Sequence, residues 1–129
     1  MLKGVPVAIA SNDEVKDPWQ LSSFIRKHQV TRVSFVPSYL SVLICISSAT
    51  QNLESLKLCV SSGEPLTSSL AMKFFSVLRS SCRLLNLYGS SEVCADVTYF
   101  EVTSENLKIN GNHILVPIGK PILNVSIKL

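Results

Sequence analysis

Two short segments of the sequence carry side chains that could hold a nucleotide. One is Asn86-Leu87-Tyr88-Gly89-Ser90-Ser91-Glu92. It offers an aromatic face for stacking, a glycine bend, two hydroxyls that can donate hydrogen bonds to phosphate oxygens, and a carboxylate of the kind that binds Mg²⁺. The other is Ser61-Ser62-Gly63-Glu64-Pro65, where small residues let a planar ligand approach the backbone closely. Together the segments could cradle a nucleotide.

Both segments come directly after stretches that are typical of buried β-strands. Residues 56–61 lead into the segment around Gly63, and residues 83–88 lead into the segment around Gly89. In open parallel sheets, ligands bind beyond the carboxyl ends of the strands, where such loops emerge. We therefore expect the two segments to meet at one edge of a sheet.

The rest of the sequence predicts the elements that would position these loops. Apolar runs at 5–10 and 31–36 predict two further strands, the second one buried. Helical spacing predicts helices over 17–28, 37–46 and 66–78, the first of which begins with Asp17-Pro18. Strands and helices that alternate in this order usually form a parallel sheet through right-handed crossovers. The predicted fold class is α/β, with a mostly parallel sheet and covering helices.

After Glu92 the sequence becomes rich in predicted strands. Strands are expected at 96–102, 107–109 and 113–116, with Asn110-Gly111 as a hairpin turn signal. A last strand is expected at 124–129, with no later residues to pair with it or cover it. The C-terminal third is therefore expected to be β-rich and to stop within a sheet.

Composition limits the classes of function. The chain has 129 residues, 47% hydrophobic and 16% charged, which suffices for one domain with a buried core. The net charge of +3 is spread without a basic run, so nucleic acid is not an expected partner. The most hydrophobic stretch, 33–49, is interrupted by Pro37 and several serines and is too short for a membrane span.

Cysteine usage and the termini indicate an intracellular protein. The four cysteines are widely spaced without a C-x-x-C pair, which argues against a zinc site or a disulfide framework. The N-terminus reaches Asn12-Asp13-Glu14 before a long apolar run can form, so it is not a secretory signal. The terminal Ile127-Lys128-Leu129 lacks the small first residue of a peroxisomal address. We expect a cytoplasmic protein and leave mitochondrial or peroxisomal location open.

The two loops and their order resemble a known family. The segment at 86–92 resembles the N-x-Y-G-P-T-E motif of the adenylate-forming superfamily, which includes acyl-CoA synthetases, luciferases and amino-acid-adenylation domains. The segment at 61–66 resembles its S-G-G-E-P-L. Residues 2–9, 33–40 and 117–122 are similar to three further family stretches, the last being I-G-R-P-I. The resemblance covers the whole chain, is nearest to the amino-acid-activating type, and implies a partial AMP-binding domain over 1–129, truncated at both ends.

The resemblance implies a role for each site residue. Tyr88 would stack on adenine, and Ser91 and Glu92 would act in catalysis, with Glu92 as the Mg²⁺ ligand. The implied nucleotide-binding residues are Ser62, Gly63, Glu64, Pro65, Asn86, Tyr88, Gly89, Ser90 and Ser91. The implied acyl pocket is formed by Phe35, Cys59, Ser61, Leu87, Ala95 and Asp96. Ser62 and Ser90 depart from the family's glycine and proline, and Ser62 adds a side chain near the expected ligand.

The family's reaction implies cofactors and partners. The substrate carboxylate attacks the α-phosphate of ATP with Mg²⁺, and the acceptor is a thiol of coenzyme A or of a phosphopantetheine-bearing carrier protein. The chemistry therefore depends on positioning and charge neutralisation. The family's phosphate loop, ribose-binding aspartate, hinge and catalytic lysine have no counterpart in this sequence. The chain alone is expected to be inactive, and its partner is expected to be a small carboxylic or amino acid.

Other interpretations compete with this one. Tyr88 could be a packed aromatic residue beside a turn, and Glu64 and Glu92 could be solvated loop acids. The chain could be a non-catalytic truncated isoform or interaction fragment. A generic doubly wound nucleotide binder is disfavoured because G-x-G-x-x-G and G-x-x-x-x-G-K-[ST] are absent. We expect His28 to lie at a helix end, His113 in a hairpin and Trp19 in the core. Cys94 is not expected to be a nucleophile.

Overall fold

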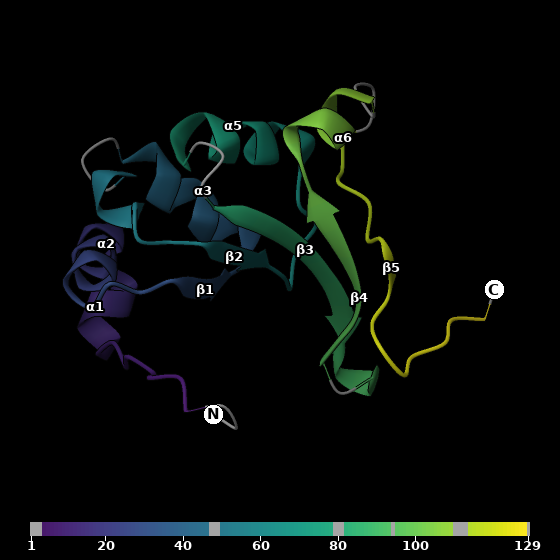
Figure 1. Cartoon of the computed structure of the whole chain (residues 1–129), viewed down its shortest axis with the longest axis horizontal. Coiled ribbons are helices and arrows are strands. Elements are labelled where there is room, and N and C mark those ends of the chain that lie inside the picture. The colour runs from purple at the N-terminus through teal and green to yellow at the C-terminus, as the bar shows by residue number, and fades with distance from the viewer. Residues whose placement is uncertain (1–3, 47–49, 79–81, 94, 110–113, 129) are drawn as a thin grey trace.

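A five-stranded mixed sheet forms the centre of the part of the chain that the structure describes. This structure, a computed structural model, describes residues 4–46, 50–78, 82–93, 95–109 and 114–128 (Figure 1). The strand order is β1-β2-β3-β4-β5. The strands are β1 (Arg32–Phe35), β2 (Leu58–Ser61), β3 (Arg83–Ser90), β4 (Ala95–Val102) and β5 (Lys120–Pro121). β1, β2 and β3 are parallel, whereas β4 and β5 pair in antiparallel fashion.

Helices α3 (Pro37–Cys45) and α5 (Ser68–Leu78) connect the parallel strands, as the sequence predicts. Helices α1 (Asn12–Lys16) and α2 (Pro18–Lys27) precede β1, α6 (Ser104–Ile109) follows β4, and η1 (Gln51–Leu53) and η3 (Ser91–Val93) are short 3₁₀ turns. α2 begins as expected, because Asp17 Oδ1 accepts hydrogen bonds from the backbone N–H groups of Trp19 and Gln20 at 2.9 and 3.3 Å. None of the described helices is long and apolar enough to cross a membrane.

The core lies between the sheet and the helices. Cys59 of β2 and Leu84 of β3 are fully buried, together with Leu43 of α3 and Phe74 of α5. Helices α3 and α5 lie side by side (Figure 1). On β2 and β3, buried residues alternate with half-buried ones, because successive side chains of a strand point to opposite faces of the sheet. The helices therefore cover one face of the parallel strands.

Two expectations for the N-terminal half are wrong. Residues 5–10 form no strand, and Val5, Val7 and Ile9 are exposed. An apolar run needs a partner strand to complete its hydrogen bonds, and no described strand pairs with this one. The strand expected at 31–36 exists as β1, but its residues alternate between exposed and half-buried, because β1 is the edge of the described sheet.

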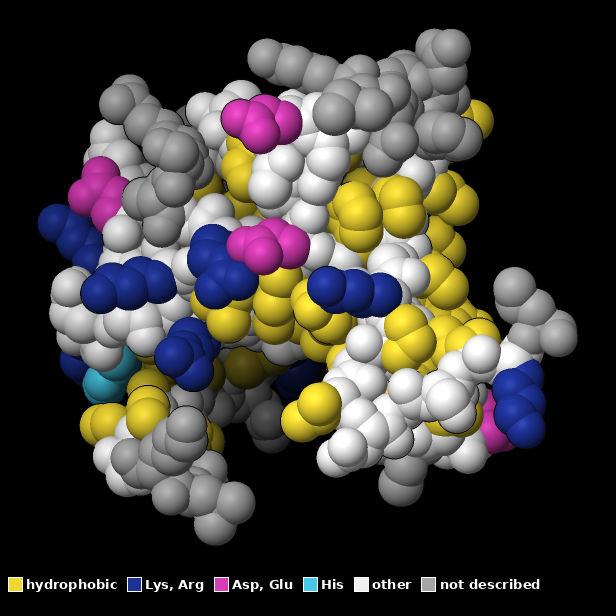
Figure 2. All heavy atoms as spheres, turned by 45° about the vertical axis from the view of Figure 1, so that its right-hand side comes forward, with side chains coloured by type: hydrophobic (Ala, Val, Ile, Leu, Met, Phe, Trp, Pro, Cys, Tyr) yellow, Lys and Arg dark blue, Asp and Glu magenta, His cyan; other side chains and the backbone are white. Residues whose placement is uncertain are grey.

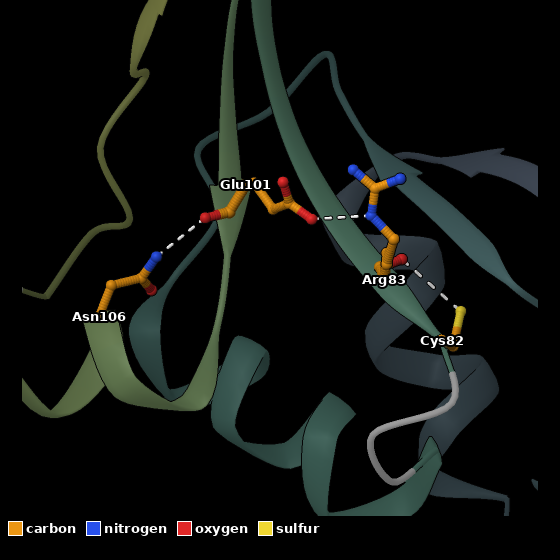
Figure 3. Close-up of polar contacts among 4 residues, drawn as sticks. All are labelled: Cys82, Arg83, Glu101 and Asn106. Carbon is orange, nitrogen blue, oxygen red and sulfur yellow. Dashed lines mark hydrogen bonds and ion pairs between the residues drawn. The ribbon is translucent and has the colours of Figure 1, made fainter.

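The antiparallel strands differ partly from the prediction. Arg83 Nε of β3 donates to Glu101 Oε1 of β4 at 2.7 Å, and Asn106 Nδ2 donates to the carbonyl of Glu101 at 2.8 Å (Figure 3). The strand expected at 107–109 is instead the end of α6. The cause is a capping box, in which the side chains and backbone N–H groups of Thr103 and Asn106 bond to each other. The expected turn at Asn110-Gly111 lies outside the described residues.

The last part of the chain runs along β4 (Figure 1). The prediction of a strand at 124–129 is wrong, because the described residues 124–128 form no strand. The short strand β5 lies earlier and pairs with Thr98 and Tyr99. Gly119 precedes β5 with φ +82°, and a Cβ there would lie 2.0 Å from the Tyr99 carbonyl oxygen. Only glycine allows this approach, so the sequence at 119–121 decides where the segment docks.

Candidate active site

The two predicted loops meet at one cavity. Ser61 is the last residue of β2 and pairs with Asn86 of β3, which continues to Ser90, so the loop after β2 lies beside the second half of β3. Between them lies a cavity of about 260 Å³. Its lining consists of Gly63, Glu64, Pro65, Leu66, Asn86, Leu87, Tyr88, Gly89, Leu115, Val116 and Ile118. The structure thus brings the expected residues of both loops together.

Residues 115–118 form a third wall that the sequence analysis did not assign to the site. The backbone N–H of Val116 donates to the carbonyl of Leu66 at 2.8 Å. Asn86 is buried, and its Nδ2 donates to the carbonyl of Pro117 at 2.9 Å. Asn86 therefore holds this wall against β3. The similarity of 117–122 to a family motif was the available signal, but the motif predicted no contact with the loops.

Tyr88 lines the cavity, and half of its surface is exposed to solvent. A half-exposed aromatic ring in a cavity wall can stack on a planar ligand. Its neighbour Gly89 lies where the register of β3 against β4 shifts. A Cβ on Gly89 would lie 1.8 Å from the carbonyl oxygen of Ala95, so no other residue fits there without a backbone movement. The glycine is thus needed for packing.

Glu64 is held by the first turn of α3. Its Oε2 accepts from the backbone N–H of Ser38 and its Oε1 accepts from Ser38 Oγ, both at 2.9 Å. The helix needs this partner, because its N-cap residue Val36 has no side-chain acceptor. Gly63 has φ +88°, which favours glycine at this bend. The Glu64 side chain therefore joins the loop to α3 while it also lines the cavity.

Ser90, Ser91 and Glu92 lie at the end of β3 and in η3, outside the cavity lining. A hydrogen bond from the Ser90 side chain is the main cause that holds the pKa of Glu92 below its ordinary value. Glu92 is exposed and ionised at neutral pH. Within the described residues no group of three or more His, Cys, Asp or Glu side chains could hold a metal ion.

The predicted acyl-pocket residues occupy two environments. Phe35 and Ser61 are paired across β1 and β2, and Leu87 lines the cavity. Cys59 and Ser61 are fully buried, and Ser61 Oγ has no hydrogen-bond partner within the described residues. Burial raises the pKa of Cys59 to about 12, so it stays a neutral thiol.

Asp96 lies at the start of β4 and reaches back to the first loop. Its Oδ1 accepts a hydrogen bond from Ser62 Oγ at 2.6 Å. Ser62 does not line the cavity, so its side chain does not fill the space expected for the nucleotide.

The remaining residues that the sequence singled out lie away from the cavity. His28 caps the C-terminus of α2 and packs against Phe24, with ring centroids 4.4 Å apart, as a helix-end residue. The expectation that Trp19 anchors the core is wrong, because its side chain is 52% exposed. Cys94 and His113 lie outside the described residues. The described cysteines, Cys45, Cys59 and Cys82, are free thiols.

Comparisons with known proteins agree with the fold and the loops. A model of the AMP-binding enzyme family matches residues 1–129. The chain is 34% identical to the beta-alanyl-bioamine nonribosomal peptide synthetase ebony of Drosophila melanogaster, over 100% of the chain and 15% of that protein. It is 30% identical to enterobactin synthase component F of Escherichia coli O157:H7, over 99% of the chain and 10% of that protein.

A solved structure shares the fold. PA1221, an NRPS protein containing adenylation and PCP domains, superposes with a TM-score of 0.68 at 20% identity, over 81% of this chain and 20% of that one. The chain therefore belongs to the family of AMP-binding enzymes. It spans only about a seventh of the Drosophila relative's length and a tenth of the bacterial one's.

Proposed function

We propose that this chain is part of an adenylation domain, which transfers AMP from ATP to a carboxylic acid and releases pyrophosphate as the bond between the α- and β-phosphates breaks. The observation that carries the proposal is the cavity of about 260 Å³. It joins the two nucleotide loops and leaves the Tyr88 ring half exposed in its wall. An adenine base would stack on this ring beside Gly63 and Pro65. Membership of the AMP-binding family supports the same ligand.

Ser91 and Glu92 are the proposed contacts to the phosphates and to Mg²⁺. The fit rests on Glu92, an exposed carboxylate in η3 directly after β3, whose pKa is held below its ordinary value by the Ser90 side chain. One or two carboxylates, with phosphate oxygens and water, are the usual Mg²⁺ ligands. When bound, the metal would neutralise charge on the phosphates. The chain's own residues would orient the acid so that its carboxylate attacks the α-phosphate.

The proposed substrate is a small amino acid. Phe35, Cys59, Ser61, Leu87 and Ala95 would line the acyl side of the site, and Asp96 would receive the amino group at the end far from the reacting carboxylate. A carboxylate in this position would be unfavourable beside a fatty acyl chain, because a carboxylate without a cationic partner is costly to bury. The competing interpretation is that Asp96 is a surface carboxylate of β4.

β-Alanine is the first substrate to test. The Drosophila relative is a beta-alanyl-bioamine synthetase by name, and its 34% identity supports an amino acid of this type. The acceptor would be a thiol of coenzyme A or of a phosphopantetheine-bearing carrier. PA1221 contains a PCP domain beside its adenylation domain, which favours the carrier.

The chain is proposed to work only inside a longer protein. Ile9, Ile114 and Leu123 are each more than 80% exposed, and hydrophobic side chains lie open over a broad part of one face (Figure 2). Large apolar surfaces of this kind are typical of regions that other protein covers. The second candidate, a non-catalytic isoform or interaction fragment, is favoured by the lack of Lys or Arg in either loop.

ATP–pyrophosphate exchange tests the proposal. The natural full-length protein is assayed with a panel of small amino acids and with medium-chain fatty acids, and the isolated 129-residue chain is assayed beside it. We expect exchange with small amino acids for the full-length protein and none for the chain alone. Failure of the full-length protein with every acid would favour the non-catalytic candidate, and turnover by the isolated chain would refute its dependence on further residues.

A further inference from the structure

A single hydrogen bond joins the first loop to the start of β4. Ser62 Oγ donates to Asp96 Oδ1 at 2.6 Å, although the residues are 34 positions apart in sequence. This length is typical of a hydroxyl that donates to an ionised carboxylate, which is stronger than a bond between neutral groups. Within the described residues, Ser62 is the hydrogen-bonding partner of this carboxylate. The other oxygen, Oδ2, keeps its acceptor capacity for a ligand.

The backbone at Asp96 is held independently of this bond. Ala95, directly before it, has φ 122°, a conformation that residues with a Cβ rarely adopt. Gly89 packs so closely that a Cβ on it would lie 2.6 Å from Asp96 Cα. Gly89 and Asp96 are also paired residues of β3 and β4. Because these contacts fix the main chain, the bond from Ser62 selects the direction of the carboxylate itself.

We propose that Ser62 is a positioning residue that aims Asp96 at the amino group of the substrate. This inference rests on the proposed function, in which Asp96 receives that ammonium group. The hydroxyl is available for this task because Ser62 lies outside the lining of the nucleotide cavity. The matching position of the family motif is glycine, which has no side chain to make the bond. The Ser62–Asp96 pair therefore adapts this chain's site to an amino acid.

A carboxylate held in one direction binds a point charge better than one that rotates freely, because less side-chain entropy is lost on binding. Removal of the Ser62 hydroxyl should therefore weaken binding of the amino acid and leave binding of the same acid without its amine unaffected. A purely structural bond would behave differently. Loss of such a bond would weaken binding of both acids and of ATP together, and it would lower the melting temperature of the protein.

The test uses the natural full-length protein with Ser62→Ala, Ser62→Gly, Ser62→Thr and Asp96→Asn. ATP–pyrophosphate exchange is measured with the preferred amino acid, β-alanine first, and with the same acid without its amine, propionate for β-alanine. We expect Ser62→Ala and Ser62→Gly to lower the preference for the amino acid about tenfold through KM, since a hydrogen bond to a charged group is lost. Ser62→Thr keeps a hydroxyl and should keep the preference, and KM for ATP should not change.

The outcomes separate this inference from the proposed function. If Asp96→Asn abolishes the preference and Ser62→Ala leaves it unchanged, the positioning role of Ser62 is overturned and the role of Asp96 stands. If Asp96→Asn leaves the preference unchanged, the ammonium role fails and the positioning role fails with it. Equal losses for both acids, with a lower melting temperature in both Ser62→Ala and Ser62→Gly, would assign the bond to stability and overturn the inference.

Discussion

Glu64 should stabilise the first turn of α3 from outside the helix. The backbone N–H and the hydroxyl of Ser38 both donate to this carboxylate at 2.9 Å, while Val36 at the N-cap offers no side-chain acceptor. A side-chain cap contributes about 0.5–2 kcal/mol, and a negative charge at a helix N-terminus about 0.3–1 kcal/mol. Because Glu64 is exposed, solvent weakens both effects, and we expect Glu64→Ala to cost about 1 kcal/mol.

Hydrogen exchange of α3 measures this effect locally in the natural full-length protein. A loss of about 1 kcal/mol corresponds to roughly fivefold faster exchange of the first-turn amides, including that of Ser38. Glu64→Gln should give a smaller acceleration, since the amide keeps one acceptor oxygen but has no charge. Glu54→Ala removes an exposed acid from the end of η1 and serves as the matched control.

The Ser38 side chain permits a double-mutant cycle. Ser38→Ala removes the bond from Oγ and keeps the bond from the backbone N–H. In that background Glu64→Ala should therefore accelerate exchange less than it does alone. The reasoning would be refuted if Glu64→Ala changed α3 no more than Glu54→Ala, or if the effects of Ser38→Ala and Glu64→Ala were fully additive.

Four further predictions concern the cavity, the proposed metal ligand and the thiols. Tyr88→Ala should raise KM for ATP about tenfold or more, since an aromatic stack on a base contributes about 1–3 kcal/mol. Tyr88→Phe should leave KM unchanged. Equal KM values for the wild-type protein and Tyr88→Ala would contradict stacking. Glu92→Ala should lower Mg·ATP-dependent exchange by orders of magnitude. The hydrogen bond from Ser90 lowers the pKa of Glu92 from 4.5, so this carboxylate should become protonated only at a lower pH than an ordinary glutamate. Ser90→Ala should raise this pKa in an NMR titration, and an unchanged pKa would exclude the bond. Iodoacetamide on the native protein at pH 8 should label the exposed Cys45 and spare the buried Cys59, whose pKa is raised to about 12; equal labelling would contradict the burial.

The elements whose signals are local could be predicted from the sequence alone. The Asp17-Pro18 pair marks the start of α2, and that helix forms where predicted because the aspartate bonds to the next turn. The apolar runs before Gly63 and Gly89 predict β2 and β3, and the order of strands and helices makes the two parallel. Two parallel strands end at the same edge, so the meeting of the two loops also followed from the sequence. The capping box of Ser11 and Glu14, which begins α1, was an equally local signal that was missed.

Features that depend on a partner far away in the sequence could not be predicted and become visible only in the folded structure. Residues 5–10 have a strand pattern, but none of the described strands pairs with them. The direction of the Glu64 carboxylate depends on Ser38, and that of Asp96 depends on Ser62. The third cavity wall is held by Asn86 through the carbonyl of Pro117. Residue types predict which bonds a side chain can make, but the choice among available partners is made by the packing that brings one of them within reach.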